Sequence, residues 1–99
     1  MLSINKTTEN QTAVFALAGR LDTLTAPELD AAIREIVPAH DELILDLAEL
    51  EYVSSAGLRV FLAAQKALSV RGKLTVKNPN ETVSEIFEVT GFSDILNIE

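Results

Sequence analysis

Two adjacent hydroxyl side chains, Ser54 and Ser55, stand where a strand-like run changes into a helical pattern, and two small residues, Ala56 and Gly57, follow them. A serine at the start of a helix can cap it, because its hydroxyl accepts a backbone N–H that is unpaired in the first turn. The positive end of the helix dipole also favours negative charge, so a phosphate on Ser55 would be held well. Because Ala56 and Gly57 carry almost no side chain, another protein's active site can approach the backbone closely. The pattern therefore indicates either an ordinary capping serine or a phosphorylation site.

The other reactive side chains offer little to an enzyme. His40 is the single imidazole and lies at an expected helix end, where a solvated turn residue is expected rather than a general base. Ser55 has no histidine within its motif, and the lone Gly57 is no glycine-rich phosphate loop, so nucleophilic catalysis and nucleotide binding lack their usual parts. Asp22 and Asp46 can form a carboxylate pair only if their loops meet, and loop capping is the alternative. We therefore expect no enzymatic activity, no cofactor and no metal site.

Composition and charge limit the partners of the chain. Its 99 residues, 47% of them hydrophobic, suffice for one domain spanning residues 1–99 whose core needs no cross-link. Cysteine is absent, which excludes disulfides and thiolate metal sites and suits a reducing compartment. Fifteen acidic and eight basic residues give a net charge of -7, which argues against nucleic acid as a ligand. The sequence begins without the pattern of a signal peptide, and no apolar run approaches the ~18 residues of a membrane span, so we expect a cytoplasmic protein that does not contact a membrane.

Hydrophobic spacing outlines the elements that hold the two serines in place. Strand-like runs occur at four places, with a short edge strand expected at the end: 3–8, 12–18, 43–47, 73–76 and 93–99. Helical spacing occurs in three segments: 25–38, 58–70 and 81–90. The sequence therefore predicts an α/β domain with a mixed sheet of four to five strands, an N-terminal hairpin and about three helices packed on the sheet.

Local signals define how these elements begin, end and connect. Thr25 and Glu28 form a capping box that starts the first helix. The strands at 43–47 and 73–76 have a single helix between them, so they should be parallel and joined by a right-handed crossover. Gly91 is placed to end the last helix.

Four short fragments stand in register along the chain: Gly19-Arg20-Leu21-Asp22, Thr25-Ala26-Pro27, Asp46-Leu47 and Tyr52-Val53-Ser54-Ser55-Ala56-Gly57-Leu58. In this order and at these intervals they resemble the STAS family, the fold of the bacterial anti-sigma factor antagonists. The resemblance covers nearly the whole chain, from the first strand to the turn at 89–92. It implies a single STAS-like domain with the architecture predicted above.

The resemblance implies a partner switch. STAS antagonists bind an anti-sigma factor that is also a serine kinase and thereby displace a sigma factor. They are turned off when that kinase phosphorylates the serine that precedes a small residue and a glycine, and a PP2C-type phosphatase restores them. In this sequence that serine corresponds to Ser55, the small residue to Ala56 and the glycine to Gly57. Ser54 stands where the family often has Asp, which makes it a minor candidate for phosphorylation.

The resemblance also assigns partner binding to six residues around this serine: Asp22, Thr23, Ser54, Ala56, Gly57 and Leu58. Asp22 corresponds to an acidic residue that helps to contact the kinase, whereas Arg20 replaces an acid that is common in relatives and indicates a different choice of partner. Two alternatives stay open. A non-switching STAS scaffold would use Ser55 only as a cap, and a small-ligand sensor would bind nucleotides.

Overall fold

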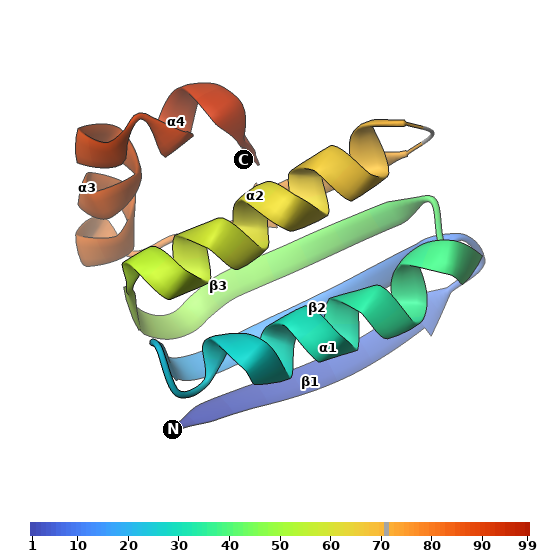
Figure 1. Ribbon diagram of the computed structural model, residues 1–99, viewed down its shortest axis with the longest axis horizontal. Coiled ribbons are helices and arrows are strands. Elements are labelled where there is room, and N and C mark those ends of the chain that lie inside the picture. The colour runs from blue at the N-terminus through green and yellow to red at the C-terminus, as the bar shows by residue number, and fades with distance from the viewer. Residues whose placement is uncertain (71) are drawn as a thin grey trace.

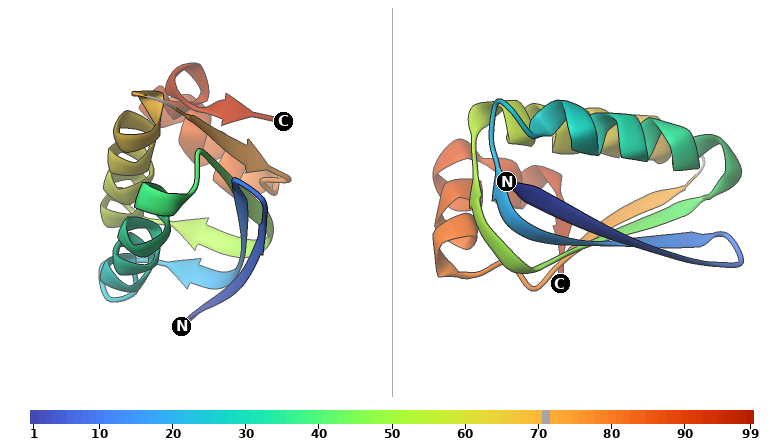
Figure 2. Two further views of the ribbon diagram at one scale, coloured as in Figure 1. Left: turned by 90° about the vertical axis from the view of Figure 1, so that its right-hand side faces the viewer. Right: turned by 90° about the horizontal axis from the view of Figure 1, so that it is seen from below.

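The computed structural model describes residues 1–70 and 72–99. Five strands form one sheet in the order in which they occur along the chain: β1 (Leu2–Glu9), β2 (Thr12–Leu21), β3 (Glu42–Val53), β4 (Lys73–Lys77) and β5 (Asn97–Ile98). The helices are α1 (Ala26–Ile36), α2 (Ser55–Ser69), α3 (Glu81–Thr90) and α4 (Phe92–Ile95), and a short 3-10 turn, η1 (Val37–Ala39), follows α1. Helices α1 and α2 run side by side across one face of the sheet, and α3 and α4 lie towards the end from which α2 begins (Figures 1 and 2).

The sheet is mixed, as the sequence predicted. Strands β1 and β2 pair antiparallel around a hairpin whose turn includes Asn10, with φ at 56°. All other neighbours, β2 with β3, β3 with β4 and β4 with β5, are parallel. The predicted α/β class, N-terminal hairpin and parallel unit around the second helix are therefore confirmed.

Strand β3 is much longer than the apolar run that predicted it. It continues past residue 47 to Val53, and its ladder with β2 shifts register twice. Ala48 and Glu49 are both exposed and interrupt the apolar alternation, so the pattern gave no sign of a continuing strand. Asp46 supports the irregular part, because its Oδ1 accepts hydrogen bonds from the Ala48 amide at 3.1 Å and from Asn78 Nδ2 at 3.2 Å. The extension brings the end of β3 level with the end of β2.

The hydrophobic core lies between the sheet and the helices that cover it. Phe15 and Leu45 are fully buried and come from neighbouring strands in register. Phe61 of α2 meets Phe87 of α3 edge to face, with ring centroids 6.0 Å apart, so the two helices share one aromatic contact. One face of α2 is buried against this core, through six residues: Gly57, Leu58, Val60, Phe61, Ala64 and Leu68.

The C-terminal part follows the prediction only in outline. Gly91 ends α3 in the left-handed conformation, with φ at 81°, as expected of a glycine at this position. The segment expected to be an edge strand instead begins with the short helix α4, and only Asn97 and Ile98 pair with β4. Within the described residues, no helix is long and apolar enough to cross a membrane.

Candidate functional site

The candidate site lies where β2 and β3 end side by side. Leu21 and Val53 are the last residue pair of the β2–β3 ladder, and the Ser54 amide adds one more hydrogen bond, to Leu21 O at 2.8 Å. The loop between β2 and α1 and the junction between β3 and α2 are therefore neighbours, although about thirty residues separate them in the sequence. Figure 1 shows both at the end of the sheet where α2 begins.

Ser54 caps helix α2. Its backbone is extended, with φ at −92° and ψ at 176°, and its Oγ accepts the Gly57 amide over a long 3.4 Å. Its carbonyl oxygen accepts the Leu58 amide at 2.9 Å. The alternative interpretation of the sequence gave the cap to Ser55, whereas the backbone geometry gives it to Ser54.

Ser55 is the first residue of α2 and is exposed. Among the described residues, nothing forms a hydrogen bond with its hydroxyl. The interpretation of Ser55 as a mere capping serine is therefore wrong, because its neighbour does the capping. The Ser55 hydroxyl is left in solvent at the positive end of a fifteen-residue helix.

Gly57 and Leu58 face inward. Gly57 is buried, and a Cβ placed on it would lie 2.7 Å from Leu21 Cγ and 3.1 Å from Val53 Cγ1. Leu58 is only 7% exposed. The small size of Gly57 therefore lets α2 sit directly on the ends of both strands, whereas the sequence had suggested that it opens the backbone to another protein. Of the two small residues, Ala56 alone is partly accessible.

The loop before α1 is held by Asp22 and Thr25. The Oδ1 atom of Asp22 accepts the amides of Leu24 at 3.0 Å and Thr25 at 3.1 Å. Hydrogen bonding from the Thr25 amide, helped by the Leu24 amide, lowers the pKa of the Asp22 carboxyl below its ordinary value. The buried Thr25 hydroxyl donates to Arg20 O and accepts the Asp22 amide, both at 2.9 Å. The predicted capping box is wrong, because Thr25 makes no side-chain cap and its hydroxyl turns back into the loop.

The tip of this loop is exposed. Thr23 and Leu24 both face solvent, and Leu24 is 84% exposed although it is a large apolar residue. Sequence reasoning missed Leu24 because it lies just before the first helix, outside any periodic pattern that would show which way it faces. The signal that distinguishes it is its place between Asp22 and Thr25, whose hydrogen bonds close a tight turn and push the intervening side chains outward.

Arg20 and Tyr52 stand opposite each other one residue before the strands end. The guanidinium carbon of Arg20 lies 4.6 Å from the centroid of the Tyr52 ring, a distance at which a cation and an aromatic ring attract each other. Tyr52 is half-buried under this contact.

The structure does not bring the other candidate catalytic residues together. Asp46 pairs with Ala16 in the middle of the sheet, far along β3 from the strand end beside Asp22, so the carboxylate pair does not form. Both acids cap backbone amides instead, which was the alternative interpretation. His40 Nδ1 lies 3.0 Å from Ile36 O at the end of α1 and η1. In residues 1–70 and 72–99 no cluster of three potential metal ligands occurs.

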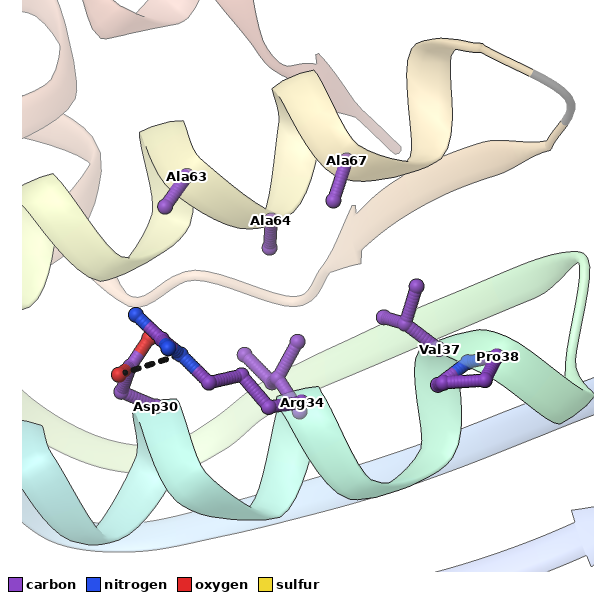
Figure 3. Close-up of a pocket in the computed structure, with 8 residues that line it drawn as sticks. Asp30, Arg34, Val37, Pro38, Ala63, Ala64 and Ala67 are labelled. Atoms are coloured by element: carbon purple, nitrogen blue, oxygen red, sulfur yellow. Dashed lines mark ion pairs between the residues drawn. The ribbon is translucent and has the colours of Figure 1, made fainter.

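A cavity of about 330 Å³ lies between α1 and α2 (Figure 3). Its lining is largely apolar: Ile33, Val37, Pro38, Ala63, Ala64 and Ala67. Asp30 and Arg34 lie at one end and pair with each other, Oδ2 to Nε at 3.0 Å (Figure 3). Ala63 follows Ser55 by eight residues, or about 12 Å along the helix axis. The cavity is thus separate from the surface around Ser55.

Comparison with known proteins assigns the family. A family model described as Mlab, STAS domain, matches residues 4–97. An anti-sigma-B factor antagonist of Listeria monocytogenes is 36% identical over 86 residues, which cover 84% of this chain and 75% of the relative. A putative anti-sigma factor antagonist of Bordetella bronchiseptica, BtrV, is 34% identical over 87 residues, covering 86% and 75%.

Solved structures agree on the fold. An anti-sigma factor antagonist from Mycobacterium paratuberculosis superposes with a TM-score of 0.90 at 22% identity, covering 99% of this chain and 85% of that one. SpoIIAA in its unphosphorylated form gives a TM-score of 0.85 at 23% identity, covering 98% and 88%. The phosphorylated form of SpoIIAA from Bacillus gives 0.78 at 22% identity, covering 98% and 91%. The chain therefore belongs to the STAS domain family, in the group of the anti-sigma factor antagonists, which are regulatory proteins and not enzymes.

Proposed function

We propose that the chain is an anti-sigma factor antagonist that acts as a phosphorylation-controlled partner switch. In its unphosphorylated form it binds an anti-sigma factor that is also a serine kinase, and the sigma factor is released. The kinase transfers the γ-phosphoryl group of ATP to Ser55 Oγ, and the phosphorylated form dissociates from the anti-sigma factor. A PP2C-type phosphatase hydrolyses the phosphoester and restores binding.

The observation that supports this proposal most directly is that Ser54 and Ser55 have different roles at the start of α2. Ser54 caps α2, so the exposed hydroxyl of Ser55 can be modified without loss of the cap. Relatives named as anti-sigma-B factor antagonists support the partner, and SpoIIAA supports the modification because a phosphorylated form of it has been solved.

The surface that we propose for docking consists of the accessible residues of both neighbouring loops: Asp22, Thr23, Leu24, Ser54, Ser55 and Ala56. Gly57 and Leu58 support this docking surface from beneath. Asp22 offers a charge that its hydrogen bonds keep ionised, and Leu24 offers an apolar contact at the loop tip. An aliphatic side chain held on a rigid turn loses little conformational freedom when it binds.

Phosphorylation changes the charge of the docking surface and leaves the fold in place. A phosphate adds about 1.5 to 2 negative charges at neutral pH, at a helix N-terminus that favours them. The partner meets this charge beside Asp22, so repulsion and bulk weaken the complex. A coupling of about 3 kcal/mol would lower the affinity ~150-fold, enough for an on–off decision.

The test begins with Ser55→Ala and Ser55→Asp as matched baits in extract of the native organism. We expect one protein with a serine kinase domain to be retained by Ser55→Ala and lost with Ser55→Asp. That kinase, purified and supplied with ATP, should place phosphate on Ser55 of the parent and of Ser54→Ala, as mapped by mass spectrometry. Phosphate found only on Ser54, or on neither serine, would overturn the proposal. Equal retention by both baits would instead indicate a non-switching scaffold.

A further inference from the structure

The outer face of α2 carries positive charge directly behind Ser55. Ser55, Arg59 and Lys66 are all exposed, and their spacing of four and seven residues puts them on one side of the helix, opposite the buried stripe. Residues four apart are neighbours on a helix surface, so Arg59 lies about 6 Å further along the axis from Ser55. This positive charge stands out in a chain whose net charge is -7.

The Arg59 side chain is available. In the described part of the chain it makes no ion pair and no hydrogen bond. Two other arginines already have partners. Arg20 of β2 lies over the Tyr52 ring, and Arg34 of α1 pairs with Asp30. Arg59 is therefore an arginine on the same side of α2 as Ser55 whose side chain is free to pair with a new negative charge there.

We propose that Arg59 binds the phosphate group of phosphorylated Ser55 as an ion pair along the first turns of α2. The inference rests on the proposed function, because it concerns the phosphate that the switch adds. The acidic partner lies N-terminal to the basic one at i and i+4, which is the favourable order on a helix. A guanidinium can donate two parallel hydrogen bonds to a phosphate, which an ammonium group cannot.

The groups around Ser55 leave the phosphate few other favourable contacts, so pairing with Arg59 would matter for its stability. The Gly57 amide already donates to Ser54 Oγ, so the helix end offers the phosphate one fewer free donor. The neighbouring acid, Asp22, repels the phosphate, since its carboxylate remains charged while accepting two amides. Arg59 offsets part of that repulsion, and its guanidinium is then paired with the phosphate. A partner would then meet a surface altered at two positions, with a phosphate added at Ser55 and the charge of Arg59 neutralised.

The experiment uses the full chain with phosphoserine placed at position 55 during translation, so no kinase is required. Titration of the phosphate by ³¹P NMR gives its second pKa in the parent, Arg59→Gln, Arg20→Gln and Lys66→Gln. We expect Arg59→Gln to raise that pKa by about half a unit, a roughly threefold change in the protonation constant, because a cation that stabilises the dianion is lost. Lys66 lies about 16 Å along the axis from Ser55, beyond the ~8 Å Debye length at physiological salt, so Lys66→Gln should leave the pKa unchanged.

Further measurements of the phosphate pKa distinguish pairing with Arg59 from binding by the helix end alone or by Arg20. Arg59→Lys should give an intermediate pKa, and about 1 M salt should shrink the Arg59→Gln effect. Equal values for Arg59→Gln and Lys66→Gln would overturn the proposal, because the helix end alone would then hold the phosphate. A shift in Arg20→Gln without one in Arg59→Gln would overturn it in favour of Arg20. Circular dichroism of the unphosphorylated variants controls for folding. If the kinase does not phosphorylate Ser55, the proposed function is refuted, but the result of this titration does not change because phosphoserine is placed during translation.

Discussion

Replacing Gly57 by alanine tests how α2 is seated on the strand ends. The added Cβ would lie 2.7 Å from Leu21 Cγ and 2.8 Å from Leu21 Cδ2, closer than carbon atoms approach in folded proteins. Leu21 is fully buried, so it cannot swing into solvent to make room. Either Leu21 is forced off its rotamer or α2 rises from the sheet.

Two opposing effects determine how much Gly57→Ala changes the free energy of unfolding. Inserting a methyl group into a well-packed site destabilises by about 1–3 kcal/mol. Alanine is a better helix former than glycine, which returns at most about 1 kcal/mol. We therefore expect Gly57→Ala to lower the free energy of unfolding by about 1 kcal/mol, corresponding to a fall in Tm of about 4–8 °C for a domain of this size.

Urea denaturation followed by circular dichroism measures this change, and a double-mutant cycle identifies its cause. Leu21→Ala removes both atoms that obstruct the new Cβ, so Gly57→Ala should be close to neutral in that background. If Gly57→Ala lowers the free energy of unfolding by the same amount in the Leu21→Ala background as in the parent, the reasoning is refuted. A Gly57→Ala protein as stable as its parent would also refute it.

Two further predictions concern the loop held by Asp22 and Thr25. Hydrogen bonding from the Thr25 amide, with help from Leu24, places the pKa of Asp22 below the ordinary 3.8, so this carboxylate stabilises the fold above about pH 4, and the contribution is lost as the pH falls through the lowered pKa. Urea midpoints measured from about pH 6 to about pH 3 should therefore decline less in Asp22→Asn than in the parent, and parallel declines would contradict this. Thr25→Val leaves Arg20 O and the Asp22 amide without their buried partner and should lower the free energy of unfolding by about 1–3 kcal/mol. Thr25→Ser keeps the hydroxyl and should lose less, so equal urea midpoints for the two variants would argue against the hydrogen bonds.

The parts of the fold that sequence reasoning predicted are those determined by local patterns. Alternation along 12–18, helical spacing along 81–90 and a glycine at position 91 each need only near neighbours to be interpreted. The α/β class follows, because a parallel pair joined by one helix allows few arrangements.

What sequence reasoning missed depends on distant residues. The extension of β3 relies on Asp46 and on Asn78, which lies 32 positions away and donates to it. Gly57 looked like an opening for another protein because nothing local reveals that Leu21 lies against it. The choice between Ser54 and Ser55 as cap depends on one extended backbone conformation, which adjacent identical side chains cannot indicate.

Strand β3 ends at Val53 and α2 begins at Ser55, so Ser54 alone joins them, and its amide is bound to Leu21 O of β2. The proposed phosphorylation site is thus attached to a stiff corner and cannot be drawn out as an extended segment into a kinase's cleft. A kinase that acts on Ser55 as proposed would have to accommodate this folded corner, and it would then recognise the folded domain and not a stretch of local sequence. A short peptide copied from this corner would carry the right residues in the wrong shape, and selectivity among antagonists in one cell would then depend on the contours of their folded surfaces.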